Sequence, residues 1–281
     1  MLGAGGYLGS EVAQKVRAAG QGEVHEIRDA AALEAIDRSI TVGAIVNCVG
    51  YFGDDRDRLR EANCDHAVRA ARIAAERDAT FVHVSSSAVF DSQKKGRFTE
   101  DGLPEPATEY GKSKLDGETA VREMMPEARI ARPAKVFGGE DPRQRLHALA
   151  RHILNRRPIP MPERKELWAN FVWRDAAAQV IAGLALAGSA PPITHVSSSM
   201  PWSEFVNALA EALQVRPRPM APLLEPPLGL LAHGLWRLPE PRPRLAARVL
   251  EIWDETEFID TRSLVSSSLF DEGLRDLAYR L

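Results

Sequence analysis

The chain has 281 residues, of which 44% are hydrophobic, and its formal net charge is −3. This length supports a substantial core in one large domain, alone or with a smaller lobe, and the absence of a concentrated basic patch argues against a nucleic-acid partner. Two cysteines, Cys48 and Cys64, suit a reducing compartment and form no metal-type CxxC pattern, and no apolar run reaches the roughly 18 residues that span a bilayer. We therefore expect a cytoplasmic protein with no metal site and no nucleic-acid or membrane partner.

Helical patterns alternate with short apolar runs over the first two thirds of the chain. Leu8, Val12 and Val16 recur at i, i+4 and i+8, and the alanine-rich stretch Asn63–Arg77 has one apolar face. In chain order, the predicted strands are Val24–Ile27, Ala44–Val49, Phe81–Val84, Arg129–Arg132 and Ile193–Val196. Strands that alternate with helices of this length predict an α/β fold with a doubly wound parallel sheet.

Two stretches break this alternation and predict a small second lobe. Residues Gly138–Pro162 are polar and arginine-rich without a strong period, and Arg216–Pro243 is rich in proline. Trp202–Leu213 and Asp271–Leu281 have the pattern of amphipathic helices. We assign residues 1–139 to the main domain, with 166–196 returning to it, and residues 140–165 and 197–281 to the small lobe.

The chain opens with a GxxGxxG pattern formed by Gly3, Gly6 and Gly9. The dinucleotide pattern GxGxxG fails, because the position it needs is Leu8. The glycines still allow a tight turn and a close approach of backbone to pyrophosphate, and the following helix offers N–H groups and the positive end of its dipole. A dinucleotide site is favoured over a glycine turn without a ligand, and its residues would be Gly3, Gly5, Gly6, Tyr7, Leu8 and Gly9.

Such a turn normally follows the central strand of the sheet. Only Met1 and Leu2 precede Gly3, so we expect the first strand to be largely missing from this chain and the native start to lie upstream. A sheet without its central strand would leave two unpaired strand edges inside the core.

The second predicted strand leads into Arg28 and Asp29. A carboxylate at this place would bind the ribose hydroxyls of NAD, whereas an arginine would pair with the 2′-phosphate of NADP. We favour NADPH through Arg28 over NAD through Asp29. A solvated Arg–Asp pair with no ligand is the alternative.

A run of three serines, Ser85–Ser87, follows the third predicted strand, at the sheet edge where this type of fold binds ligands. Farther along, Tyr110 and Lys114 lie at i and i+4 of a predicted helix and share one face. The ammonium would favour the phenolate, which makes Tyr110 a usable general acid or base. Ser86 would hold a substrate oxygen whose charge changes during hydride transfer, although turn-forming serines are the alternative.

These motifs, in this order, resemble the extended short-chain dehydrogenase/reductases, the NAD(P)-dependent epimerase/dehydratase family with a Rossmann fold. The most similar branch is that of the dTDP-4-dehydrorhamnose reductases. The resemblance covers residues 1–200, and its most specific stretches are VHVSSSAVFDS at Val82–Ser92 and FTEDGLPEPATEYGKSKLDGE at Phe98–Glu118. The chain departs from the branch at Ser87 and Ala88, where an aspartate and a tyrosine are usual.

The resemblance implies the following roles. Ser86, Tyr110 and Lys114 would be catalytic. The residues implied to bind the cofactor beyond the glycine turn are Cys48, Val49, Gly50, Asn63, Ser85, Tyr110, Lys114 and Pro133, and substrate candidates are Ser87, Phe137, Arg145 and Trp173.

The predicted function is an NAD(P)H-dependent reductase of a nucleotide-sugar or another keto substrate. An NAD-dependent epimerase or dehydratase and a non-catalytic cofactor-binding subunit are the alternatives. The family resemblance also suggests a homodimer, formed through Asn63–Arg77 and Lys112–Arg122.

Overall fold

Four parallel strands form the main sheet of the computed structural model, which describes residues 1–27, 30–37, 39–90, 99–140, 145–159, 161, 168–219 and 267–281. Every neighbouring pair in this sheet is parallel. The order across the sheet is β1 (Ala44–Asn47), β2 (Thr80–Val84), β3 (Arg129–Pro133) and β7 (Ile193–Val196). All four strands were predicted, β7 with the same bounds and β1 ending two residues earlier than expected.

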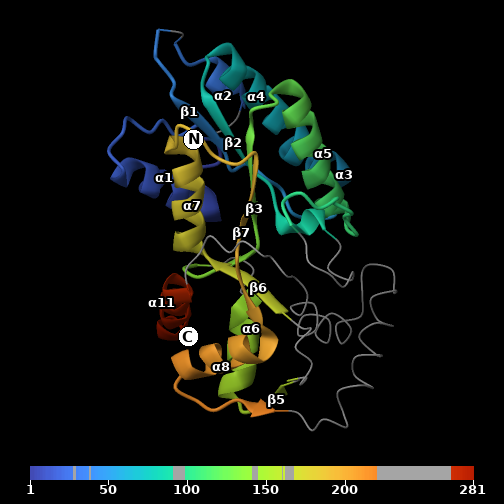
Figure 1. Cartoon of the computed structure of the whole chain (residues 1–281), viewed down its shortest axis with the longest axis vertical. Helices are drawn as coiled ribbons and strands as arrows, with labels where there is room; N and C mark the ends of the chain where they lie inside the picture. Colours follow the sequence, from blue (N-terminus) through green and yellow to red (C-terminus); the bar gives the residue numbers. More distant parts are fainter. Residues whose placement is uncertain are drawn as a thin grey trace.

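Helices cover both faces of this sheet, so the predicted doubly wound α/β fold is confirmed (Figure 1). On one face α1 (Tyr7–Ala18) packs against α7 (Arg174–Leu186), and on the other α4 (His66–Glu76) packs against α5 (Glu109–Met124). Small side chains allow the close approach of α4, which buries Ala67, Ala70, Ala71 and Ala74.

A single residue, Leu2, takes the place of the first strand. Its N–H donates to the Val46 oxygen at 2.9 Å, and its own oxygen accepts from the Cys48 N–H at 3.0 Å. On its other side Leu2 bridges Ile27, and its side chain is fully buried. The strand predicted over Val24–Ile27 is wrong except at its last residue, because one bridging residue offers no ladder along which four residues could pair.

Shorter elements connect these strands and helices. They are α2 (Ala30–Glu34), α3 (Arg56–Arg60), the π-helical turn η1 (Glu61–Asp65) and the 3₁₀ turn η2 (Ser87–Val89). The Asp55 carboxylate caps α3 by accepting from the N–H groups of Asp57 and Arg58, each at 3.1 Å. The chain then runs from α3 through η1 into α4.

A second sheet has three strands. In it, β6 (Trp168–Trp173) pairs in parallel with β4 (Lys135–Phe137) and antiparallel with β8 (Ser198–Pro201). The remaining elements of this half are α6 (Arg145–Leu154), α8 (Trp202–Ala212), α11 (Ser267–Tyr279) and the paired strands β5 (Pro158–Ile159) and β9 (Arg218–Pro219). Of the stretch 166–196, β6 thus joins the second sheet, while β7 joins the first.

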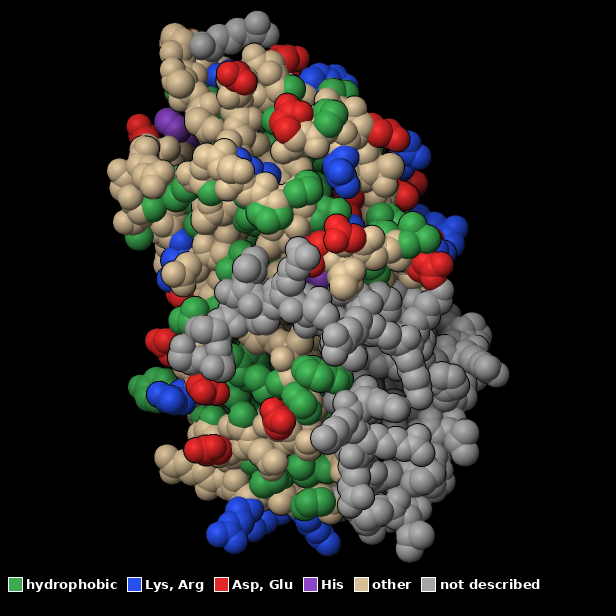
Figure 2. Space-filling view, in the orientation of Figure 1, with side chains coloured by type: hydrophobic (Ala, Val, Ile, Leu, Met, Phe, Trp, Pro, Cys, Tyr) green, Lys and Arg blue, Asp and Glu red, His purple; other side chains and the backbone are tan. Residues whose placement is uncertain are grey.

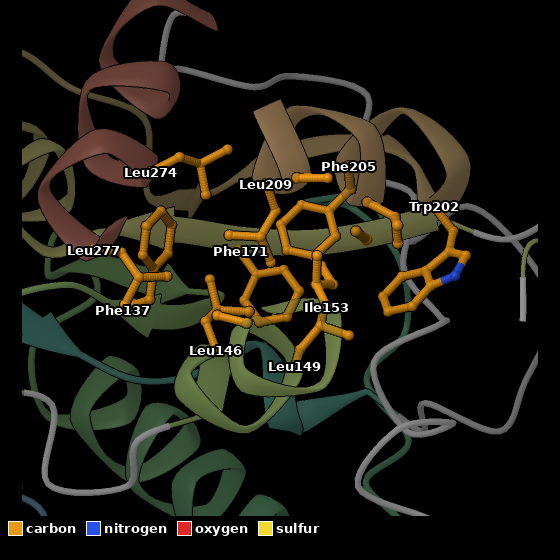
Figure 3. Packing of buried hydrophobic residues seen from close by; sticks show 14 of the residues in the cluster. Phe137, Leu146, Leu149, Ile153, Phe171, Trp202, Phe205, Leu209, Leu274 and Leu277 are labelled. Carbon is orange, nitrogen blue, oxygen red and sulfur yellow. The ribbon is translucent and has the colours of Figure 1, made fainter. Parts of the chain in front are cut away.

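The lobe has an aromatic core of its own (Figure 3). Phe171 stacks on Phe205, with ring centroids 4.9 Å apart. Helix α6 adds a buried stripe at i, i+3, i+4 and i+7, formed by Leu146, Leu149, Ala150 and Ile153. The prediction that Gly138–Pro162 lacks a helical period was therefore wrong, since arginine and histidine side chains between these positions hide the stripe.

The two helices expected in the lobe are both present as α8 and α11, the second starting at Ser267. Most of the proline-rich stretch Arg216–Pro243 lies outside the described residues. None of the described helices is long and apolar enough to cross a membrane.

On the face seen in Figure 2, acidic and basic side chains are mixed over the half that contains α4 and α5. Glu109, for example, lies 3.1 Å from Arg56 and 2.8 Å from Lys112. A partner that covered this face would have to match both signs of charge.

Candidate functional site

The glycine turn before α1 leaves no room for side chains at two of its motif glycines. Gly3 has a φ of +71°, and a Cβ on it would lie 2.8 Å from main-chain atoms of Cys48 and Val49. A Cβ on Gly9 would lie 2.1 Å from the Gly3 oxygen, which also accepts the Gly6 N–H at 3.0 Å. Glycine is therefore required at both places for α1 to pack against the end of β1.

The outer side of the same turn is open and suits an anion. Gly5 and Gly6 are exposed, and a Cβ on Gly5 would meet nothing within 4 Å. Gly6 is the N-cap of α1, and no side chain caps the first turn of the helix. Uncapped N–H groups and the helix dipole favour a phosphate at this position. The turn fits the pyrophosphate that the motif predicts.

Tyr7 begins α1 but directs its hydroxyl away from the turn. The hydroxyl donates to the Gly138 oxygen at 2.6 Å, across 131 residues of sequence. The Arg174 guanidinium lies 5.2 Å from the centre of the Tyr7 ring and pairs with Glu11 of α1 at 2.8 Å. Gly138 and Gly139 both have positive φ. These contacts connect the pyrophosphate turn to the segment after β4, a link that local sequence patterns do not contain.

Leu8 packs into the core on the α1 side, and Pro133, the last residue of β3, is buried. Leu8 is partly buried and Pro133 is buried, so their contribution to a cofactor site would come mainly from the main chain. Arg28 and Asp29 lie outside the described residues. The choice between NADPH and NADH therefore stays a prediction.

Residues 48–50, after β1, approach two other predicted site residues. A Cβ on Gly50 would lie 3.3 Å from Oδ1 of Asn63 and 3.8 Å from Nζ of Lys114. The three residues come from separate parts of the chain, and the fold brings them together.

Asn63 is fully buried in η1 and braces this loop through its amide group. Its Oδ1 accepts from the Tyr51 N–H, and its Nδ2 donates to the Tyr51 oxygen and to Oγ of Ser113, each at 2.9 Å. A Cβ on Gly117 of α5 would lie 2.2 Å from the main-chain oxygen of Asn63. Asn63 thus holds the loop against α5 instead of presenting its side chain to a ligand.

A buried polar pair, Asn47 and His83, joins the ends of β1 and β2. Nδ2 of Asn47 lies 3.3 Å from Nδ1 of His83, and Oδ1 of Asn47 accepts from the Val49 N–H at 3.1 Å. Burial, and secondly the charge of Lys114, holds the pKa of His83 well below its usual range. Burial raises the pKa of Cys48 to about 12. Both side chains are therefore neutral at ordinary pH.

The serine run after β2 forms a turn. Oγ of Ser86 accepts from the Ala88 N–H at 3.1 Å, and Ser86 is half-buried. A hydroxyl that accepts a hydrogen bond still carries its own proton for donation. Ser85 is 4% exposed, and its N–H donates to the Ala131 oxygen at 2.7 Å. Ser86 therefore caps a turn and keeps a proton that it could donate to a substrate oxygen.

Tyr110 and Lys114 lie one turn apart at the beginning of α5. Oγ1 of Thr108 caps this helix by accepting from the Gly111 N–H at 3.0 Å. A Cβ on Gly111 would lie 2.1 Å from the Ala88 oxygen, so the first turn of α5 packs directly on the serine turn. The predicted i, i+4 arrangement is present, and the helix that carries it contacts the predicted serine element.

Lys114 is 2% exposed, and its Nζ donates to the oxygen of Val84, the last residue of β2, at 2.8 Å. Burial lowers the pKa of Lys114 to about 8, and the Glu118 carboxylate counteracts part of that lowering. Near neutral pH this side chain is therefore a buried cation beside the end of β2.

The sequence patterns missed Phe52, an aromatic side chain beside Tyr110. The two ring centroids are 4.8 Å apart at 65° between planes, and Phe52 is 56% exposed. The preceding residue, Tyr51, is held by Asn63 and by the Arg58 guanidinium 4.4 Å from its ring centre. The Phe52 ring therefore packs against one side of Tyr110. No periodicity in the loop that carries Phe52 could have indicated this contact.

The four substrate candidates lie in different places. Ser87 is half-buried in the serine turn, whereas Phe137 is 1% exposed inside the lobe core. Trp173 is half-buried and so close to Gly138 that a Cβ there would lie 2.7 Å from its ring. Arg145 begins α6, but its side chain lies outside the described part of the structure.

A parallel sheet covered on both faces, with a glycine turn opening α1, is the arrangement of dinucleotide-binding proteins with a Rossmann fold. Within that class, the chain belongs to the family described as the RmlD substrate binding domain, whose model matches residues 1–225. The resemblance predicted from the sequence is confirmed.

Two relatives show how the similarity is distributed. The dTDP-4-dehydrorhamnose reductase of Mycobacterium tuberculosis is 30% identical over 227 residues, 75% of this chain and 73% of that protein. A protein of Haloferax volcanii described as a "probable low-salt glycan biosynthesis reductase" is 31% identical over 159 residues, but the match spans only about half of each protein, 49% and 53%.

Among solved structures, a dTDP-4-dehydrorhamnose reductase from Bacillus anthracis in complex with NADP superimposes with a TM-score of 0.67. It is 18% identical, and the match covers 100% of this chain and 96% of that one. This match shows that the two chains share a fold.

Proposed function

We propose that this protein reduces the keto group of a nucleotide-linked sugar with NADPH, and that Ser86, Tyr110 and Lys114 carry the chemistry. Family membership and relatives named as dTDP-4-dehydrorhamnose reductases support the reaction and the substrate class. The observation that carries the assignment is the packing of the first turn of α5 on the serine turn, with Lys114 bonded to the end of β2. In doubly wound sheets ligands bind at this edge.

The cofactor would lie along the carboxyl ends of the strands. N–H groups at the start of α1 would bind its pyrophosphate, and residues 48–50, braced by Asn63, would line its nicotinamide end. Arg28 is proposed to pair with a 2′-phosphate, which favours NADPH. When bound, the reduced nicotinamide supplies a hydride to the carbonyl carbon.

Three side chains would serve the carbonyl oxygen. Tyr110 donates its phenolic proton to this oxygen as the carbon is reduced, which gives the alcohol. The Ser86 hydroxyl donates a hydrogen bond to the same oxygen and stabilises its developing charge. The Lys114 ammonium stabilises the phenolate left on Tyr110.

The test uses purified protein, NADPH and dTDP-4-dehydrorhamnose, with NADPH loss and product followed together. Tyr110→Phe should reduce turnover by about 10²-fold or more while NADPH still binds. Tyr279→Phe is the control, because Tyr279 is 93% exposed in α11. Full activity of Tyr110→Phe would contradict the mechanism.

The same assay separates the alternatives. Product without net NADPH loss would assign an epimerase or dehydratase instead. Binding of NADPH or NADH without turnover of the substrate would assign the non-catalytic cofactor-binding role. The proposed homodimer through α4 and α5 is tested separately by the solution mass of the protein.

A further inference from the structure

Glu118 and Arg132 form a buried ion pair close to Lys114. Nε of Arg132 donates to Oε1 of Glu118 at 3.0 Å, and Nη2 donates to Oε2 at 2.7 Å. The side chains of Arg132 and Glu118 are only 2% and 4% exposed. Because taking two charges out of water costs free energy that apolar packing would not, such a pair is weak support for stability alone. Its position suggests another role.

Glu118 lies on the same face of α5 as Tyr110 and Lys114. Tyr110, Lys114 and Glu118 follow one another at i, i+4 and i+8. Lys114 bonds to Val84 at the end of β2, and Glu118 bonds to Arg132 on the adjacent strand β3. Two neighbouring strand ends therefore fix the rotation of α5 about its axis.

The titratable side chains around Lys114 differ in charge. Glu118 faces it from α5, Cys48 from the segment after β1, and His83 from β2. The Cys48 thiol is protonated and the His83 ring is neutral, as shown above. Tyr110, one turn before Lys114 on α5, is the group whose phenolate the ammonium is proposed to stabilise. In the described part of the chain, Glu118 is therefore the carboxylate that acts on the buried ammonium.

We propose that Glu118 is a positioning residue that keeps Lys114 charged in its buried site, and that the two hydrogen bonds from Arg132 hold the Glu118 carboxylate in place. The inference rests on the proposed role of Lys114. Without the Glu118 charge, the ammonium would lose its proton more readily, and a neutral amine would no longer stabilise the Tyr110 phenolate.

The test is an NMR titration of the cofactor-free protein labelled with ¹³C-lysine. The chain has seven lysines, and the Lys114 signal is the one that Lys114→Arg removes. In Glu118→Gln the titration midpoint of Lys114 should fall by about one pH unit or more. Simple loosening of the site would have the opposite effect, because hydration would move the midpoint up towards 10.5. An unchanged or higher midpoint overturns the proposal.

Two further variants make the result secure. Glu118→Gln leaves Arg132 buried without its partner, so Glu118→Gln combined with Arg132→Gln removes both charges; the Lys114 midpoint should fall here too, and a rise would count against the proposal. Glu123→Gln is the matched control, because it removes one carboxylate from the exposed side of α5. Its Lys114 midpoint should equal that of the parent protein, and a comparable fall would show a general charge effect and overturn the assignment to Glu118.

The titration is independent of turnover. A protein that shows the predicted fall but reduces no keto sugar would keep this inference and refute the proposed function. If the protein reduces the substrate but the Lys114 midpoint is unchanged in Glu118→Gln, the proposed function stands and this inference is refuted. Where both hold, the activity of Glu118→Gln should also show a shifted pH profile.

Discussion

The Tyr7 hydroxyl donates a 2.6 Å hydrogen bond to the main-chain oxygen of Gly138, and thereby joins the first turn of α1 to the segment that leads into the lobe. Tyr7→Phe removes this bond and should lower the free energy of unfolding by about 1 kcal/mol. Urea unfolding measures the change, and Tyr279→Phe serves as the control because that ring is 93% exposed. Equal unfolding midpoints for the two variants would mean that the link contributes nothing.

Gly9 offers a test of the closed side of the glycine turn. A Cβ at this position would lie 2.1 Å from the Gly3 oxygen, so Gly9→Ala should destabilise the protein by about 1–3 kcal/mol or prevent folding. Gly183→Ala is the matched control, since a Cβ there meets nothing within 4 Å in α7. It should stabilise the helix by about 0.5–1 kcal/mol. Thermal unfolding of both variants should therefore shift in opposite directions.

Asn63→Ala should release the loop after β1. The change leaves the Tyr51 N–H and oxygen without their partner, at a cost of about 1–3 kcal/mol for unsatisfied buried groups. Hydrogen exchange at the Tyr51 amide should become faster, and the affinity for NADPH should fall. Ser113→Ala, which removes one of the three Asn63 bonds, should have the smaller effect on all three measurements.

Lys114 makes stability depend on pH in a defined window. Burial lowers its pKa to about 8, below the usual 10.5. Between these values the unfolded chain holds more protons at Lys114 than the folded one, so this residue adds stability as the pH rises through the window and adds none below it. Compared with Lys114→Met, the parent protein should gain up to about 3 kcal/mol across the window. Urea unfolding of both proteins at pH values below and within the window measures this gain. If Lys114 were exposed in the folded protein, the difference in the free energy of unfolding between the parent and Lys114→Met would not change with pH.

Arg28 and Asp29 predict which cofactor is preferred. Arg28→Ala should weaken NADPH about 10-fold or more through the loss of a charge-assisted phosphate contact, and should leave NADH nearly unchanged. Asp29→Ala is the counterpart and should weaken NADH more than NADPH if that carboxylate binds the ribose. Equal losses for both cofactors in Arg28→Ala would remove the basis for preferring NADPH.

The sequence predicted the main sheet well, because its strands are buried apolar runs between regular helices. Phe81–Val84 and Ile193–Val196 needed no knowledge of distant partners. Val24–Ile27 has a similar composition, but a strand also needs a neighbour to pair with, and Leu2 provides only one bridge. The three-stranded sheet was missed for the same reason, since the pairing of β4 with β6 depends on residues far apart in sequence.

The features of the candidate site also fall into two groups, those that local spacing in the sequence predicts and those that depend on tertiary packing. Tyr110 and Lys114 could be found because helical spacing places them on one face. The bond from Tyr7 to Gly138 and the contact of Phe52 with Tyr110 depend on tertiary packing, and no spacing in the chain encodes them. Glu118 was visible as part of a motif, but only its burial beside Arg132 indicates what it does.

The contact between Gly117 and Asn63 also limits how the protein can move. With main chains this close, any sliding of α5 over η1 would produce a steric clash. Asn63, the loop after β1 that it holds, and helix α5 therefore form one rigid unit. If the protein closes around a ligand, the displacement must therefore occur outside this unit.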